Sequence, residues 1–485
     1  MGARIRLLRK GTAGQGGRRR SLHPLSSTAR GGTVVSGRDA LFDVAEELIR
    51  RAVAAGADQA EAAVAWTRQA ETRIENGEVH TAQALEETSF GLRVFAGRRL
   101  GFATANTIRP GDLQACVEEA IAQARTTPSD PANGLPPSYA IRPVPGLFDP
   151  KLAGLDVSWT TRTARRLVDR VAARDPRVRV DSGEVTLETS SFALVSTEGT
   201  RAFEESTTAR GYLFGMAVEG DQVASFDYDG SATHSLGQAE SLFNAAADRF
   251  VEKCLAGLGA RPGKSYRGAV VLSPEAVAEF LLEDLIAAAS ADNVRKGKSR
   301  LAGKIGKKIA ARSFTVIDDP TQPGAVGSCA FDREGVPTRR YPIVEHGTLK
   351  GYLFNHYEAK VAGLPEGSTG HAVGSATSLP QIGPHRLEVL PGDTSLADLL
   401  EGGPVVYVGR FSGSTNPVTG EFSGVVKNGF LCENGRRQPV NETLVAGNLF
   451  DALARISGLS RERRLVGGTR LVPAVRLEDV SVTAG

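Results

Sequence analysis

Residues 268–293 read GAVVLSPEAVAEFLLEDLIAAASADN, and the fold predicted for the second half of the chain starts from this stretch. The short apolar run at 268–272 is typical of a buried strand. Ser273 can cap a helix with its hydroxyl, and Pro274 suits a first turn because that turn needs no amide donor there. We therefore predict a strand that leads directly into a helix spanning residues 273–293.

Upstream of this stretch, hydrophobic periodicity and turn signals predict two mixed units. The first unit, residues 38–127, is a helix, several strands and a second helix. The second unit, residues 151–261, contains the same order of helix, strands and helix, and the proline-rich segment 128–150 connects the two units. The predicted elements are helices at Arg38–Gly56, Pro110–Ala124, Thr161–Ala173 and Gln238–Leu258, turns at Asn76-Gly77 and Ala96-Gly97, and strands from Val178 to about Ser231.

Downstream, residues 262–485 favour strands and turns, with short helices expected only at Ser395–Leu400 and near Asn448–Ile456 besides the 273–293 helix. The predicted fold class is α+β: an N-terminal mixed α/β region with antiparallel strands, followed by a β-rich C-terminal domain. Residues 1–37 are rich in arginine and polar residues, so we expect a disordered basic extension there.

Four stretches of the C-terminal half carry a resemblance to a known family. In the same order and spacing as in that family, the chain contains PGAVGSCAFDREGVPTRR (323–340), VEHGTLKGYLFNHYEA (344–359), NPVTGEFSG (416–424) and ENGRRQPVNETLVAGNL (433–449). Together they resemble the TldD/PmbA metallopeptidase family, over a region from about Leu41 to Val482. This family has a zinc-bearing branch, TldD, and a histidine-less branch, PmbA or TldE.

The resemblance implies that the 273–293 helix should carry HExxxH in a zinc-bearing member. Two histidines of that motif bind zinc, and its glutamate acts as general base. The family pattern places Glu283 and Ala288 at the two histidine positions and Asp284 at the glutamate position. Ala288 has no donor atom, so we interpret these three residues as a degenerate zinc site.

No other part of the sequence offers a replacement for the missing ligands. The seven histidines contain no pair at helical ligand spacing, and the stretch 464–475, where the zinc branch has a cysteine ligand, contains none. Four widely spaced cysteines form no CxxC pair, which argues against a disulfide framework and a structural zinc site. We expect no cofactor in this chain, and zinc in a partner subunit.

The composition favours a cytoplasmic protein. The chain has 485 residues and 41% hydrophobic residues, enough for large cores. All nine bases before Asp39 lie in an acid-free tail, which leaves 49 bases against 55 acids in the body. A mildly acidic body is not typical of nucleic-acid binding. The tail lacks an apolar signal region, and no stretch has transmembrane length without charges.

Three local patterns suggest other chemistry but are better explained by structure. GKS at 263–265 lacks the first glycine of a phosphate-binding loop, since Leu258 stands there. The run 295–312 has eight bases without an aromatic residue to stack on nucleic-acid bases, so a role in the gyrase modulation historically associated with the family gains little support. Cys329 shows no partner histidine in sequence and is interpreted as a small buried thiol.

The segment 416–422 matches the family best, and its residue types predict a turn followed by an outgoing strand. Its role is either architectural or, beside an exposed strand edge, in binding an extended peptide by β-augmentation. The residues concerned are Asn416, Pro417, Thr419, Gly420 and Phe422.

The resemblance therefore implies a non-catalytic, metal-free subunit of a heterodimeric metallopeptidase. A TldD-like HExxxH partner would supply the zinc, and this chain would help to hold unfolded or extended polypeptide for proteolysis and peptide maturation. An alternative is an independent, chaperone-like homodimer that binds peptides without cleaving them. A hydrolase that uses Glu283, Asp284 or Cys329 is the least favoured hypothesis.

Overall fold

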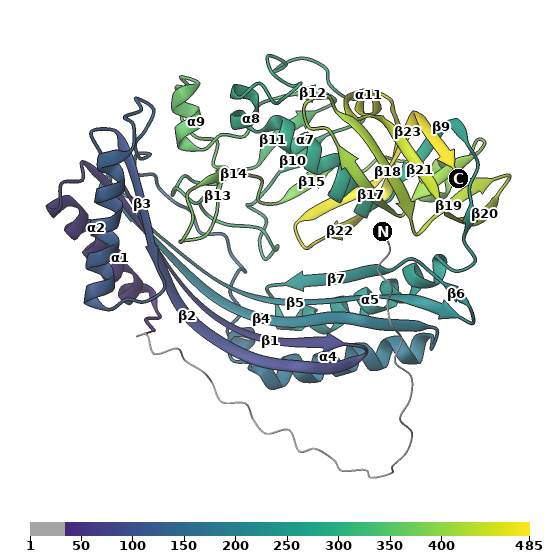
Figure 1. Cartoon of the computed structure of the whole chain (residues 1–485), viewed down its shortest axis with the longest axis horizontal. Coiled ribbons are helices and arrows are strands. Elements are labelled where there is room, and N and C mark those ends of the chain that lie inside the picture. Colours follow the sequence, from purple (N-terminus) through teal and green to yellow (C-terminus); the bar gives the residue numbers. More distant parts are fainter. Residues whose placement is uncertain (1–33) are drawn as a thin grey trace, which may run out of the picture.

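The computed structural model describes residues 34–485, and its N-terminal half is built on one long antiparallel sheet. The strand order is β3-β2-β1-β4-β5-β6, with β7 paired to β5. Four of the strands contain 17 to 19 residues, and the sheet curves along its length (Figure 1). The bounds are β1 Gln59–Glu75, β2 Glu78–Ala96, β3 Arg99–Ala105, β4 Val178–Ser196, β5 Arg201–Glu219, β6 Gln222–Val223 and β7 Asp227–Thr233.

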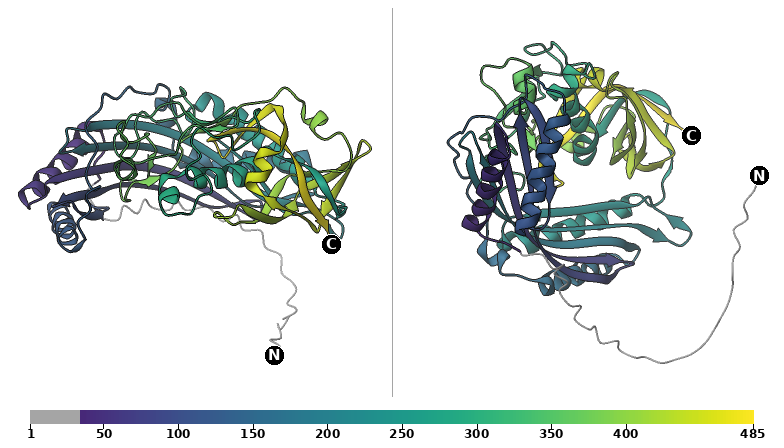
Figure 2. Two further views of the ribbon diagram at one scale, coloured as in Figure 1. Left: turned by 90° about the horizontal axis from the view of Figure 1, so that it is seen from above. Right: turned by 60° about the vertical axis from the view of Figure 1, so that its left-hand side comes forward.

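Helices cover one face of this sheet. Because side chains alternate along a strand, the even-numbered residues of β1, such as Ala62 and Val64, pack on the helices. Odd-numbered Glu61 and Ala63 point to the opposite face, where Ala63 packs with Phe331 of the C-terminal half. Figure 2 shows the helices outside the curve and the C-terminal strands inside it. The helices are α1 Arg38–Ala54, α2 Pro110–Thr126, α3 Pro150–Ala153, α4 Val157–Arg174 and α5 Leu236–Ala256.

The C-terminal half forms a second, mixed sheet of 14 strands and a separate two-stranded ribbon. The main path runs β12-β11-β10-β15-β23-β9-β16-β19-β20-β8. Its strands are β8 Arg261–Pro262, β9 Tyr266–Leu272, β10 Val316–Asp318, β11 Tyr341–Glu345, β12 Thr348–Leu349, β15 Leu387–Val389, β16 Val405–Val408, β17 Arg410–Thr415, β18 Glu421–Lys427, β19 Gly429–Glu433, β20 Arg436–Asn441, β21 Thr443–Asn448, β22 Ile456–Val466 and β23 Arg470–Ala484. The ribbon pairs β13 Ala372–Val373 with β14 Gln381–Ile382.

The α+β fold class predicted from the sequence is confirmed, and the turn chemistry also holds. Asn76 and Gly77 both have positive φ between β1 and β2, as do His346 and Gly347 between β11 and β12. Asparagine and glycine tolerate this left-handed backbone, which a two-residue hairpin needs.

Two expectations about helices are corrected. The 273–293 helix is not continuous: α6 Pro274–Ala276 leads into a π-helical segment, η1 Val277–Leu281, then α7 Leu282–Ala289, and it ends at Ser290 before α8 Ala291–Arg295. The helix ends because the backbone of Leu353 bonds to Ala289 and Ala291 on both sides of Ser290. A helix was also missed, α9 His356–Val361, which Asn355 caps through the amide of Glu358. The two further helices are α10 Leu396–Leu399 and α11 Leu449–Ala454.

The predicted units 38–127 and 151–261 both supply strands to the first sheet, and the proline-rich connection has no helix or strand over residues 127–149. The division into separate domains stays a prediction. The predicted disordered extension falls on residues outside the described range, except for 34–37, where Val35 bonds to the Thr88 side chain. No helix within residues 34–485 combines the length and apolar character that crossing a bilayer requires.

Four buried charges join the two halves. Arg93 of β2 donates to Glu61 of β1 at 2.7 Å and to Glu334 at 2.9 Å, and Arg333 donates to Glu61 at 3.0 Å. These four side chains are each at most 7% exposed. Burial alone would raise the pKa of Glu61, but the two guanidiniums outweigh it and the pKa is lowered.

Glu61→Ala should lower the free energy of unfolding by about 3–5 kcal/mol, because it leaves two guanidiniums buried without their shared carboxylate. The measurement is urea unfolding followed by circular dichroism. Glu47→Ala is the matched control, since Glu47 pairs with Arg50 on an exposed surface of α1, and it should cost less than about 1 kcal/mol. Equal losses in the free energy of unfolding of the two variants would contradict the stabilising role of the buried network.

Candidate functional site

The helix interpreted from the sequence as a degenerate zinc site, which comprises α6, η1 and α7 and is called the degenerate helix below, begins as its sequence predicts. β9 ends at Leu272, and the Ser273 hydroxyl accepts the amide of Ala276 at 3.0 Å. The same hydroxyl donates at 2.6 Å to the carbonyl of Gly409, which directly follows β16, the strand paired with β9. The helix is therefore fixed to the second sheet at its N-terminus.

Glu283 and Ala288 could not hold a metal ion between them. Ala288 is 3% exposed and offers no donor, while the half-exposed Glu283 carboxylate accepts from the Arg470 guanidinium of β23. Arg470 belongs to the stretch 464–475, in which the family resemblance implies a cysteine ligand for the zinc branch. In this chain that stretch places a positively charged guanidinium beside Glu283. Within residues 34–485 no group of three histidine, cysteine, aspartate or glutamate side chains is arranged to hold a metal ion. The residues present do not fit zinc.

Asp284 faces the loop that follows β17. Burial raises the pKa of Asp284, a hydrogen bond from the Thr415 side chain partly opposes this effect, and the neighbouring Glu283 adds to it. Thr415 is the last residue of β17 and directly precedes the family-matching segment 416–422. The structure thus brings together two regions that are about 130 residues apart in the sequence.

Hydrogen bonds and close packing hold the turn of segment 416–422 in place. The Asn416 carboxamide oxygen accepts the amides of Val418 and Thr419, which closes the turn. Gly420 has φ +77°, and a Cβ there would meet the ring of Phe450 at 2.5 Å. Exposed Pro417 forms the tip with its neighbours.

Phe422 anchors this segment to the degenerate helix. Its side chain is 5% exposed and lies edge-on to Phe280 of η1, with ring centroids 4.9 Å apart. Phe411 stacks on the same Phe280 ring at 4.4 Å. These contacts support the architectural interpretation of the loop, whereas its peptide-binding role stays a prediction.

A cleft of about 540 Å³ lies beside Glu283. Its walls come from α7, α8, α9 and β14, which are distant in sequence, and include Ile286, Asn293, Tyr357, Glu358, Gln381 and Ile382. Arg295 donates to both oxygens of Glu358 across this region, at 2.8 Å and 3.0 Å to one oxygen and 2.8 Å to the other. The walls of the cleft therefore contain ion-paired side chains and backbone groups, together with a few apolar side chains.

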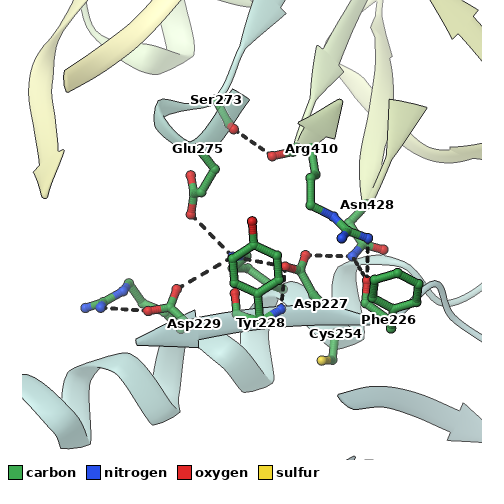
Figure 3. Close-up of polar contacts among 12 residues, drawn as sticks. Phe226, Asp227, Tyr228, Asp229, Cys254, Ser273, Glu275, Arg410 and Asn428 are labelled. Carbon is green, nitrogen blue, oxygen red and sulfur yellow. Dashed lines mark hydrogen bonds and ion pairs between the residues drawn. The ribbon is translucent and has the colours of Figure 1, made fainter. Parts of the chain in front are cut away.

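A second charged cluster, which the sequence did not suggest, holds the degenerate helix against the first sheet (Figure 3). The Lys253 ammonium of α5 lies 3.1 Å from Asp227, 3.7 Å from Asp229 and 3.3 Å from Glu275 of α6. Burial would lower the pKa of Lys253, but the three carboxylates outweigh it and raise the pKa. Arg464 also pairs with both Asp229 and Glu275.

This cluster is electrically balanced. Three carboxylates, those of Asp227, Asp229 and Glu275, are matched by the cations of Lys253, Arg464 and Arg249, which donates to Asp229 at 2.9 Å. Tyr228, between the two aspartates in sequence, donates to Glu279 of η1. Such a network is suited to anchoring the helix rather than to transferring protons.

Cys329 has a histidine neighbour after all, which corrects the expectation from sequence. Its Sγ lies 3.4 Å from Nδ1 of His385, 56 residues away, at a small cavity of about 210 Å³. The His385 Nε2 donates to the Gly370 carbonyl, so Nδ1 accepts from the thiol. Burial raises the pKa of the Cys329 thiol well above its usual value and also lowers the pKa of His385. The pair is therefore a neutral thiol and a neutral imidazole, and the thiol is not activated as a nucleophile.

Two carboxyl groups line the same cavity. Burial raises the pKa of Glu204 to about 7, although the amide of Ala330 donates to it at 2.7 Å. Burial, followed by repulsion from Glu334, raises the pKa of Asp332 to about 8. At pH 7 Glu204 is therefore near the midpoint of its titration, whereas the Asp332 carboxyl is mostly protonated.

Glu204 should make stability pH-dependent. Its pKa is higher in the folded state, so its contribution is fully present below its unfolded value of 4.5 and is lost as pH rises towards about 7. Across that pH window, the free energy of unfolding of the wild type should fall by up to about 3 kcal/mol relative to that of Glu204→Gln. Urea unfolding below pH 4.5 and above pH 7 measures this difference. The exposed neighbour Glu205→Gln should behave like the wild type, and parallel pH curves for all three proteins would contradict the account.

Comparisons with known proteins match both halves of the chain. The family model for the PmbA/TldA metallopeptidase C-terminal domain matches residues 265–484, and the model for domain 1 matches residues 60–124. An uncharacterized protein of Methanocaldococcus jannaschii is 30% identical over 365 residues, which cover 74% of this chain and 82% of the relative. Metalloprotease PmbA of Escherichia coli O157:H7 is 25% identical over 465 residues, 92% of this chain and 98% of the relative.

The crystal structure of TldE from Thermococcus kodakarensis has the same fold. It superposes with a TM-score of 0.82 at 26% identity, over 91% of this chain and 100% of that chain. The similarity thus extends through the curved first sheet, the degenerate helix and the C-terminal strands. On these grounds the chain belongs to the PmbA/TldD metallopeptidase family.

Proposed function

We propose that this chain is the metal-free, PmbA/TldE-like subunit of a heterodimeric metallopeptidase. The observation that carries the proposal is the ion pair between Arg470 and Glu283, with Ala288 buried beside it on the same helix. An arginine is permanently cationic and would repel a metal ion at this position. In this proposal the helix and strands around the family's zinc site are retained, while the ion pair of Arg470 and Glu283 takes the place of the metal ligands.

In this proposal the zinc and the catalytic residues come from a TldD-like subunit with HExxxH. Such a subunit would activate a metal-bound water with its own glutamate. Its partner here contributes the cleft beside Glu283, whose mixed polar and apolar walls suit an extended polypeptide more than a small charged substrate. Asp284, Glu283 and Cys329 have no catalytic role in this scheme.

The Phe422 contacts and the Lys253 cluster support the same role. Both hold the degenerate helix firmly on the second sheet and against the first. A rigid wall of this kind would position a partner's substrate without taking part in the chemistry. The substrates would be unfolded polypeptides or peptide precursors undergoing maturation.

The test is reconstitution with an HExxxH relative from the same genome. Cleavage of an unfolded fluorescent polypeptide should need both chains, should stop when a chelator removes zinc, and should return when zinc is restored. Replacing the HExxxH glutamate of the partner with glutamine should cost at least about 100-fold in rate, whereas Asp284→Asn in this chain should leave cleavage within a few-fold of the wild type.

Three results would reject the proposal. One is cleavage by this chain alone that a chelator abolishes. Another is equal activity of the HExxxH relative with and without this chain. The third is a loss on Asp284→Asn as large as the loss on the partner's glutamate variant. A chain that binds unfolded polypeptide but never assembles with the HExxxH relative would instead match the independent peptide-binding alternative.

A further inference from the structure

The small cavity beside Cys329 contains a carboxylate that has no cation partner. The cavity measures about 210 Å³ and lies between β4 and β5 of the first half and residues of the second half. The Ala330 amide donates to Oε2 of Glu204, a residue of β5, at 2.7 Å. Within residues 34–485, Oε1 accepts no hydrogen bond, and no lysine, arginine or histidine forms an ion pair with this carboxylate.

The other charged or titratable side chains at the cavity already have partners. The Arg333 guanidinium donates to a buried glutamate and to two backbone carbonyls. Both oxygens of Asp332 accept backbone amides. Sγ of Cys329 lies 3.4 Å from Nδ1 of His385. Among the charged and titratable groups that line the cavity, Oε1 of Glu204 is therefore the acceptor left for a ligand.

The walls of the cavity suit a short alkyl chain that ends in a cation. Phe192 and Phe331 line it with ring centroids 6.2 Å apart, and Val373 adds an aliphatic surface. Aromatic faces attract cations, and apolar walls remove alkyl carbons from water. At about 30 Å³ per water molecule, the volume equals that of about seven waters, which is less than a drug-sized ligand fills. The cavity is open to a ligand, since the Cys329 and Val373 side chains are partly exposed.

The free acceptor also distinguishes among cations. A guanidinium binds best to two carboxylate oxygens at once, whereas one oxygen of Glu204 is engaged with the Ala330 amide. A metal ion needs several ligands, and no three histidine, cysteine, aspartate or glutamate side chains in residues 34–485 are arranged to supply them. An ammonium group is compact, and one of its three donors can bond to a single oxygen.

We propose that this cavity binds a primary alkyl ammonium group, with the cation on Oε1 of Glu204 and the alkyl chain against Phe192 and Phe331. The ligand is a free alkyl amine or the side chain of a lysine in a polypeptide, since both present the same group. The cavity shares no lining residue with the cleft beside Glu283. Binding therefore requires neither zinc nor an HExxxH subunit.

Calorimetric titration of the full-length chain with n-butylammonium chloride at pH 8 tests the proposal. Binding should saturate at one ligand per chain, and butan-1-ol should bind about tenfold more weakly or worse, because it lacks the charge. Glu204→Gln should raise the dissociation constant of the ammonium by about tenfold or more. Val373→Lys should also block binding, because it places an ammonium group of the chain itself in the cavity. The control is Glu205→Gln, an exposed neighbour that should leave binding unchanged.

The affinity for n-butylammonium should fall severalfold between pH 8 and pH 6. The pKa of Glu204 is about 7, so its carboxyl takes up a proton across this range and loses the charge that holds the ligand. Asp332, with a pKa of about 8, acts in the same direction. The thiol of Cys329 and the imidazole of His385 stay neutral, because the pKa is raised for the first and lowered for the second, and Arg333 stays charged. In Glu204→Gln the pH dependence should be smaller than in the wild type.

Nα-acetyl-lysine amide distinguishes the two sources of the ammonium group. Binding within a few-fold of n-butylammonium supports a lysine side chain as the ligand, whereas binding of n-butylammonium alone supports a free amine. Three results overturn the proposal: no saturable binding of either ammonium compound, equal affinity in Glu204→Gln and the wild type, or tighter binding of Nα-acetyl-arginine amide than of the lysine compound. Circular dichroism of each variant should match the wild type, so that a loss of binding reports on the cavity.

Discussion

The structure depends on the buried exchange of hydrogen bonds among Glu61, Arg93, Arg333 and Glu334. Two guanidiniums and two carboxylates in an apolar interior are tolerable only because each charge finds its opposite at hydrogen-bond distance. The network joins the concave face of the first sheet to the C-terminal half. Glu334 also accepts the amide of His356 at the start of α9, which forms one wall of the cleft. The position of that wall is therefore coupled to the first sheet.

The Lys253 cluster plays the corresponding part at the other end. It binds β7 and α5 to α6, where the degenerate helix begins. Between these two points lies the helix that we propose as a degenerate zinc site, and its Glu283 forms an ion pair with Arg470. Under the proposed function, the chain would retain the elements that surround a metallopeptidase site without the metal ligands.

Much of the fold could be predicted from the sequence because local signals agreed with tertiary structure. The apolar face of α1 and the Asn76-Gly77 hairpin are examples. The helix end at Ser290 could not be predicted, since it depends on backbone bonds from Leu353, more than 60 residues away. The Cys329–His385 contact was missed for the same reason. A weak signal did exist for the buried network: Glu61 and Arg93 stand within otherwise apolar strand runs, where an unpaired charge would be costly.

The central claim is that this chain does not itself hold the catalytic metal, and zinc titration of the purified chain tests it most directly. Equilibrium dialysis against zinc followed by metal analysis should find no stoichiometric zinc, and Glu283→Ala should change nothing. The degenerate helix predicts this result because Ala288 offers no ligand and Arg470 is bound to Glu283. One tightly bound zinc ion per chain that is lost in Glu283→Ala would contradict the account.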